Sequence, residues 1–205
     1  MGISQQIGAS SLIKPGVIDN TAARPASPYE GQVVYQKDTD EVLAYNGTAW
    51  VYPNANKIAI FQEQYTTGNK PGVANSGGWT KRVLNTTVVN NITGCSIASS
   101  VITLTAGTYF VNGISPFYKL DSVQIRLRNT TASTNAALGQ STFIASSVNI
   151  MNFAPLVGYF TLTASTNLEL QYYVSGASIN TNDQGVATSN GSTEVYASLT
   201  IQQVS

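Results

Sequence analysis

The feature that most constrains this chain is a long series of short, strand-like segments. From residue 57 onward, segments rich in β-branched and aromatic residues recur with Gly, Asn and Ser turn signals between them. No helical 3.6-residue period and no helix-length gap interrupts the series, so the pattern predicts an all-β sandwich or barrel of antiparallel strands. The expected strands are Ile58–Phe61, Trp79–Leu84, Val101–Leu104, Thr108–Asn112, Val123–Arg128, Thr142–Ile144, Leu156–Leu162, Leu168–Val174 and Glu194–Ile201.

The stretch Val101–Val111, VITLTAGTYFV, shows this pattern most clearly. It reads as two strands separated by a turn at Ala106-Gly107. Alternation places Ile102 and Leu104 in a core, and Tyr109 and Val111 continue the buried set after the glycine. Two strands cannot bury such a face alone, so a second sheet must cover it.

The sequence before this series divides into two parts. Residues 1–26 contain two short apolar pairs, Leu12-Ile13 and Val17-Ile18, but no core of their own, which predicts an extended N-terminal docking arm. Residues 27–56 predict a small three-stranded β module and a linker, with Asn46-Gly47 at a tight hairpin turn. The module is too small to be stable alone, so we expect it to pack against neighbouring chains or the main domain. Residues 57–205 form the expected head domain.

Composition argues against several classes of partner. Ten Lys and Arg balance ten Asp and Glu at a pI near 6.2, so no basic footprint for nucleic acid is visible. No apolar run approaches the roughly 20 residues of a membrane span, and we expect no membrane insertion and no signal peptide. Neutral polar residues and eleven tyrosines suit contacts with sugars or other subunits. The single cysteine, Cys95, excludes an internal disulfide.

Catalytic signals are also missing. The chain has no histidine, the usual general base and a common metal ligand. The acidic cluster at Asp38, Asp40 and Glu41 lacks the glycine and distal glutamate of a calcium loop, so we expect a polar turn there and no metal or cofactor. A glycan depolymerase would need two carboxylates across one cleft, and the remaining acids are scattered, although some can meet in space or across subunits. Those acids are Glu63, Asp121, Glu169, Asp183 and Glu194.

Two arginines are candidate ligand residues. Arg126 and Arg128 point to the same side of one expected strand, where they can bind an anionic sugar. A solvated face or a salt bridge between subunits is the simpler explanation for them.

Several tyrosines suggest a subunit interface. Large aromatic residues are adjacent in Tyr159-Phe160 and Tyr172-Tyr173, so both faces of these strands carry apolar surface. Tyr159, Tyr173 and Tyr196 are the candidates for the outward side, because a lone sandwich would present polar residues there. A half-exposed tyrosine on a plain surface is the alternative.

The motifs of the second half resemble those of the trimeric jelly-roll heads typified by tumour necrosis factor and the complement globular head. The matching pieces are Gly78-Trp79 through Arg82 to Asn85, Ile102 to Val111, Ile125-Arg126-Leu127, Gly158-Tyr159-Phe160 and Leu168-Glu169-Leu170. The resemblance implies a jelly-roll sandwich that assembles as a homotrimer. The first half, with Gly-Gln-Val-Val-Tyr and Tyr-Asn-Gly-Thr-Ala-Trp, resembles repeats in structural proteins of tailed bacteriophages.

Together these features predict a non-enzymatic virion structural protein, made in the host cytoplasm and displayed as a homotrimer. The arm would attach it to other virion proteins, of the capsid or the tail. Two roles remain open: a head fibre or capsid decoration, and a receptor-binding fibre tip that recognises a host glycan or protein. A depolymerase is a distant third.

Overall fold

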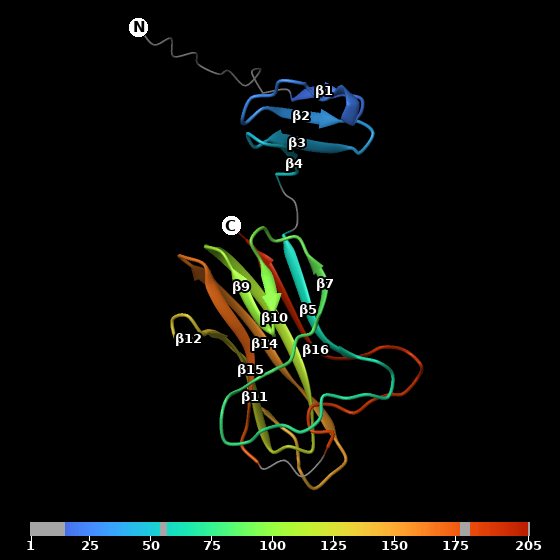
Figure 1. Ribbon diagram of the computed structural model, residues 1–205, viewed down its shortest axis with the longest axis vertical. Coiled ribbons are helices and arrows are strands. Elements are labelled where there is room, and N and C mark those ends of the chain that lie inside the picture. Colours follow the sequence, from blue (N-terminus) through green and yellow to red (C-terminus); the bar gives the residue numbers. More distant parts are fainter. Residues whose placement is uncertain (1–14, 54–56, 177–180, 205) are drawn as a thin grey trace. The chain divides into compact units, whose positions relative to one another are not determined.

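The computed structural model describes residues 15–53, 57–176 and 181–204. The chain divides into two compact units, residues 1–55 and 56–205. Figure 1 shows both as β structures, and each is described by itself below.

The N-terminal unit is a single four-stranded sheet in the order β1-β2-β3-β4. Its strands are β1 (Gly16–Ile18), β2 (Val33–Gln36), β3 (Glu41–Tyr45) and β4 (Trp50–Val51), and a short 3-10 helix, η1, covers Thr21–Ala23. The three strands expected here are present. The sheet also has a fourth strand, because β1 pairs in parallel with β2.

This fourth strand contradicts part of the predicted docking arm. Val17 and Ile18 belong to β1 and are part of the sheet, so they do not lie in an extended arm. The other two arm candidates, Leu12 and Ile13, fall outside the described residues.

The C-terminal unit is an antiparallel sandwich of two sheets, which confirms the predicted jelly-roll fold (Figure 1). The first sheet has the order β14-β10-β16-β5-β7, and the second has the order β12-β11-β15-β9-β8 with β13 beside β11 and β6 beside β15. In the first sheet the strands are β5 (Ile58–Tyr65), β7 (Thr86–Asn90), β10 (Gly107–Tyr118), β14 (Met151–Leu162) and β16 (Glu194–Gln203). In the second they are β6 (Thr80–Lys81), β8 (Ser96–Ala98), β9 (Val101–Leu104), β11 (Ser122–Asn129), β12 (Thr134–Leu138), β13 (Thr142–Phe143) and β15 (Thr166–Val174).

The core lies between these sheets. Ile102, Leu104, Tyr109 and Val111 are all fully buried, as alternation along Val101–Val111 predicts. The turn at Ala106-Gly107 carries the chain from one sheet to the other, since β9 belongs to the second sheet and β10 to the first. This short stretch therefore contributes to both walls of the core.

Three strands were not expected from the sequence: β7, β8 and β12. All three lie at the edge of their sheet and consist largely of polar or small residues. An edge strand has one partner and buries less side-chain area, so its apolar alternation is weak. Conversely, only Thr80–Lys81 of the expected strand Trp79–Leu84 pairs with a neighbour.

Candidate functional site

The outer face of the first sheet carries no charged side chain. Its outward positions form cross-strand rows, because directly paired residues share a face. One row runs Tyr159, Phe110, Gln202, Ile58, and the next runs Val157, Asn112, Thr200, Ile60. A third row runs Pro155, Ile114, Ser198, Gln62. We call these three rows, with Phe153, the uncharged face.

The apolar members of this face are concentrated on β14. Tyr159 is 64% exposed and Val157 is 62% exposed, and Phe153 and Ile114 are also exposed. Four strands about 4.8 Å apart give each row a width of roughly 14 Å. A contiguous apolar surface of this kind marks an interaction site far more often than a plain solvent-facing sheet.

A second apolar patch lies beside β14. Leu138 at the end of β12 and Phe143 in β13 are exposed, at 52% and 65%. A shallow hollow of about 100 Å³ lies next to them, lined by Leu138, Gly139, Gln140, Pro155 and Val157. We call Leu138 and Phe143 the edge patch, since they come from the border of the second sheet.

The three tyrosines proposed for an interface occupy different surroundings. Tyr159 lies on the uncharged face. Tyr173 lies on the outer side of the second sheet, where it is half-buried against Trp79 with ring centres 5.7 Å apart.

Tyr196 was expected on the outside, and that placement is wrong. Its side chain is 6% exposed, and its hydroxyl donates to the Asn69 carbonyl oxygen. The cause is a register shift between Val195 and Ser198 in β16, which reverses the alternation, so Val195 faces out and Tyr196 faces in.

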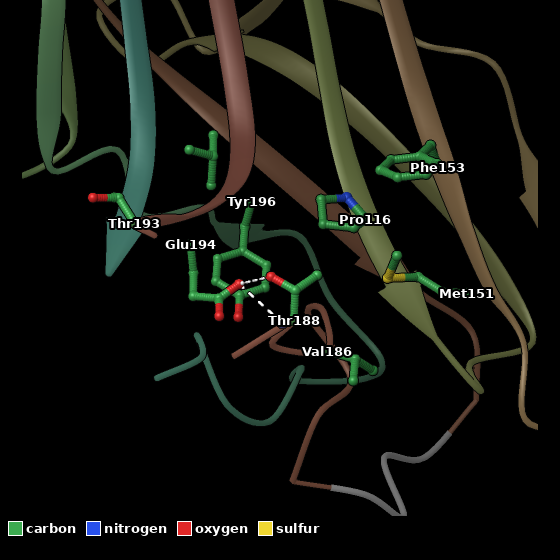
Figure 2. Close-up of a pocket in the computed structure, with 9 residues that line it drawn as sticks. Pro116, Met151, Phe153, Val186, Thr188, Thr193, Glu194 and Tyr196 are labelled. Atoms are coloured by element: carbon green, nitrogen blue, oxygen red, sulfur yellow. Dashed lines mark hydrogen bonds between the residues drawn. The ribbon is translucent and has the colours of Figure 1, made fainter. Parts of the chain in front are cut away.

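A hollow of about 200 Å³ opens near the start of β16 (Figure 2). Pro116, Met151 and Phe153 lie on one side of it, and Glu194 and Tyr196 on the other. Its volume is below the roughly 300–1,000 Å³ of typical small-molecule sites. Of its polar groups, Glu194 accepts hydrogen bonds from Thr188, and the Tyr196 hydroxyl donates to the Asn69 carbonyl oxygen.

Glu194 holds two long loops together. Its carboxylate accepts hydrogen bonds from the backbone amide and hydroxyl of Thr188 (Figure 2) and from the backbone amides of Gly68 and Ser189. The backbone amides of Thr188, Ser189 and Gly68 lower the pKa of Glu194 to about 2. The residue therefore orders the loops around 68 and 188, and all its acceptor capacity is directed to them.

A second buried carboxylate is neutralised by an arginine. Glu63 Oε2 lies 2.7 Å from Arg82 Nε, and both side chains are fully buried. Arg82 also donates to the side-chain and backbone oxygens of Gln184, and Tyr65 donates to Glu63. Burial raises the pKa of Glu63, and the positive charge of Arg82 opposes that rise. The pair links β5 to the loop at Gln184, and it has no contact with an open cleft.

The outer face of the second sheet is charged, unlike the uncharged face. Arg126 and Arg128 lie on the same side of β11, with Ile125 and Leu127 buried between them. The Arg126 guanidinium lies 4.0 Å from the centre of the Trp79 ring and donates twice to Gln171 Oε1. Lys81 and Glu169 complete this group, 3.8 Å apart.

The acidic side chains of the head unit are more buried than its basic side chains. Of its five acidic residues, Glu63, Asp183 and Glu194 are buried, and Asp121 and Glu169 are half-buried. All its cations except Arg82 are half-buried or exposed. The accessible charge of this unit is therefore positive, although the chain as a whole is neutral.

Other types of site find no support in the described part of the chain. Residues 15–53, 57–176 and 181–204 contain no group of three His, Cys, Asp or Glu side chains arranged to hold a metal ion. Within the same ranges, no helix is long and apolar enough to cross a membrane.

Comparisons with known proteins give a similarity of fold. No family model matches the chain, and no curated protein matches it in sequence. Among solved structures, the globular domain of the zebrafish complement 1qA protein is 10% identical, with a TM-score of 0.49, covering 73% of this chain and 98% of that one. Murine APRIL is 9% identical with a TM-score of 0.49, and the match covers 73% of this chain and 99% of that one. Eiger TNF from S. frugiperda is 10% identical with a TM-score of 0.46, and the match covers 73% of this chain and 93% of that one. The function proposed below therefore rests on the surfaces of this chain itself.

Sequence reasoning missed the residues that define these surfaces most sharply. Phe153 and Ile114 escaped notice because the expected strands began at Leu156 and ended at Asn112. Val157 lies inside the expected strand Leu156–Leu162 but was not singled out. The uninterrupted pairing of β10 with β14 over twelve positions shows that they belong to one face. The alternation of Phe153, Val157 and Tyr159 was the available signal.

Proposed function

We propose that the head unit is a non-enzymatic trimerisation and display domain, whose uncharged face is buried between copies of the chain. The observation that carries this proposal is the exposure of Tyr159, Val157, Phe153 and Ile114 on a sheet face without a single charge. A neighbouring copy can approach this face without like-charge repulsion. The gain in buried apolar surface favours association.

A closed ring fits the two apolar surfaces better than a two-fold pair. A two-fold interface uses the same patch on both partners, whereas a cyclic trimer brings two different patches together. The uncharged face and the edge patch of Leu138 and Phe143 are two such patches on adjoining strands. The edge patch of one copy then packs against the uncharged face of the next. The jelly-roll resemblance of the sequence implies a homotrimer but does not specify these patches.

One pair of variants tests which face is buried. Tyr159→Glu places a charge on the most exposed apolar residue of the uncharged face and should yield monomers in light scattering. Tyr173→Glu places the same charge on the opposite sheet, beside Arg126, and should leave the trimer intact. If Tyr173→Glu dissociates the assembly and Tyr159→Glu does not, the interface lies on the other side of the sandwich.

We further propose that the protein is a bacteriophage virion component, a head fibre or capsid decoration. The support is the resemblance of residues 28–52 to repeats in tailed-phage structural proteins. Attachment to other virion proteins then uses the N-terminal segment. The test is to add full-length protein and a variant lacking residues 1–14 to particles deficient in this protein and to measure co-sedimentation. Equal incorporation of both would refute attachment through that segment.

A second candidate function, recognition of an anionic host glycan, is favoured by the charge separation in the head. Arg126, Arg128 and Lys81 surround a single half-buried carboxylate, Glu169, on the outer face of the second sheet. Trp79 and Tyr173 add aromatic surface beside them. The basic group spans only neighbouring strands, which suits a charged sugar unit better than the long phosphate track of a nucleic acid.

Polygalacturonate and neutral dextran are suitable probes for this second role. The full chain should bind polygalacturonate at low salt and not dextran, and Arg126→Gln or Arg128→Gln should weaken binding about tenfold, or about 1.4 kcal/mol. Lys119→Gln, which removes a cation elsewhere on the head, is the matched control. Equal loss in all three variants would indicate non-specific charge attraction. Unchanged adsorption of deficient particles to host cells would favour the decoration role.

A further inference from the structure

The N-terminal sheet has one face that is apolar and uncovered. Two cross-strand rows make up this face: Val17, Tyr35 and Val42 across β1, β2 and β3, and Val33, Ala44 and Val51 across β2, β3 and β4. Val17, Val42 and Val33 are 60%, 47% and 37% exposed, and the other three are half-buried. We call these six residues the valine face.

The opposite face of the same sheet is covered by the unit's own chain. Val34 and Leu43 are buried there, and so is Gln36, at 1% exposure. Gln36 accepts a hydrogen bond from Arg24 and donates to Thr21, so the segment containing η1 lies over it. A polar glutamine is thus buried on one face, while three valines of the same sheet face outward on the other. This reversal of the usual pattern indicates that the valine face is covered in the assembled protein.

We infer that the valine face is a second self-association surface, packed against the valine faces of other copies in the trimer. This inference rests on the proposed trimer of the head. Six residues, 52–57, join β4 to β5, so each N-terminal sheet is tethered within about 20 Å of its own head. In a trimer, three such sheets are held in one small volume at a millimolar effective concentration.

The chemistry of the face suits identical partners. None of its six side chains is charged, and its one side-chain hydroxyl, that of Tyr35, donates a hydrogen bond to Asp40. Three copies can therefore meet around a three-fold axis without repulsion, and each buries its valines against its neighbours. An isolated sheet of this size has little core, and such packing supplies the missing second layer.

Disulfide trapping tests the arrangement in the full chain. In a Cys95→Ser background, Val42→Cys and Val33→Cys are made separately, and Thr48→Cys, in the exposed turn between β3 and β4, is the control. A disulfide requires the two Cβ atoms to approach within about 4.5 Å. At least one of the two valine variants should form covalent dimers on mild oxidation at least about tenfold faster than Thr48→Cys. If neither exceeds the control, the inference is wrong.

Amide hydrogen exchange supplies a readout without cysteines. Protection of β2 and β3 should fall when Tyr159→Glu dissociates the head, because the sheets then lose their shared packing. Unchanged protection would mean that the valine face is covered by its own head or by nothing, and would overturn the inference. The experiments distinguish failure of the head trimer from failure of the valine face as an interface. A wild-type monomer in light scattering refutes the head trimer, whereas an intact trimer without trapping refutes only the role of the valine face.

Discussion

Arg82 is the largest fully buried side chain in the described structure, and its only carboxylate partner there is Glu63. Replacing Arg82 by Met leaves the Glu63 carboxylate buried without a counter-ion, which should cost about 3–5 kcal/mol of unfolding free energy. The double variant Glu63→Leu with Arg82→Met should lose clearly less than the single one, because no charge is left unpaired. Urea denaturation of the wild type, Glu63→Leu, Arg82→Met and the double variant gives the coupling energy between the two side chains.

Lys81 provides the control for this cycle. It is the neighbouring cation, but its side chain is 38% exposed and lies 3.8 Å from Glu169. Lys81→Met should change the unfolding free energy by no more than about 0.5 kcal/mol. Strict additivity of the Glu63 and Arg82 effects would show that the buried pair does not act as a unit.

Glu194 predicts a specific response to acid. Its pKa is lowered to about 2 in the folded chain from an ordinary value of 4.5, so between these values the unfolded state binds more protons. Its stabilising contribution is therefore complete above about pH 4.5 and is lost as the pH falls through about 2. Urea denaturation at a series of pH values, at fixed protein concentration, should show a flatter acid decline in Glu194→Gln than in the wild type.

Glu63 is present in both the wild type and Glu194→Gln, so its own effect on the pH dependence of the unfolding free energy cancels in this comparison. Parallel pH profiles for the wild type and Glu194→Gln would contradict the role assigned to the backbone amides of Gly68, Thr188 and Ser189.

The buried ion pair could not be predicted from the sequence, for a definite reason. The expected strand ended at Phe61, so Glu63 fell outside it, whereas β5 continues to Tyr65. Apolar alternation stops at Phe61, and an inward-facing glutamate is recognised only once its arginine partner is placed. By contrast, Ile125, Leu127, Ile102 and Leu104 follow simple alternation and are all fully buried.

At the scale of elements, Gly158 shows why the motif Gly158-Tyr159-Phe160 needs a glycine. A Cβ at position 158 would lie 2.4 Å from the Ala137 Cβ and 3.3 Å from Val111. Gly158→Ala should therefore force β12 away from β14 and cost about 1–3 kcal/mol. Adding Ala137→Gly should restore most of the stability, as measured by thermal denaturation.

Gly78→Ala is the matched control for this change, because nothing lies within 4 Å of a Cβ built there. If the Gly78 and Gly158 variants lose equal stability, the close approach of β12 to β14 does not account for the effect.

Elements at the centre of each sheet were predictable, and those at the borders were less so. β9, β11, β15 and β16 have strong apolar alternation because both neighbours and the opposite sheet bury them. β14 extends five residues before the expected start at Leu156, because Pro155 interrupts the strand-forming residues at that point. The register shift in β16 likewise has no signature in the residue pattern, and it misplaced Tyr196.

At the scale of the whole molecule, the two units should differ in independence. The head has a continuous core between two sheets, whereas the N-terminal unit buries only Val34 and Leu43 among its described apolar side chains. A chain lacking residues 1–52 should therefore remain folded and trimeric, with a cooperative thermal transition. Loss of that transition would mean that the N-terminal unit contributes to the stability of the head.

The sequence led to the fold and to one residue of the uncharged face, Tyr159, but not to the surface as a whole. The uncharged face depends on which strands lie side by side, and β14 and β5 are separated by two intervening strands in the sheet and about 90 residues in the chain. The valine face could not be predicted from the sequence for a similar reason. Val17 joins it only because β1 pairs with β2, whereas the sequence placed Val17 in an extended arm.

The most direct test of the central claim is the mass of the full chain in solution. Light scattering coupled to size exclusion, at micromolar concentration, should return about three times the 21.7 kDa of the single chain. A mass equal to one chain, stable across the concentration range, would contradict burial of the uncharged face between copies.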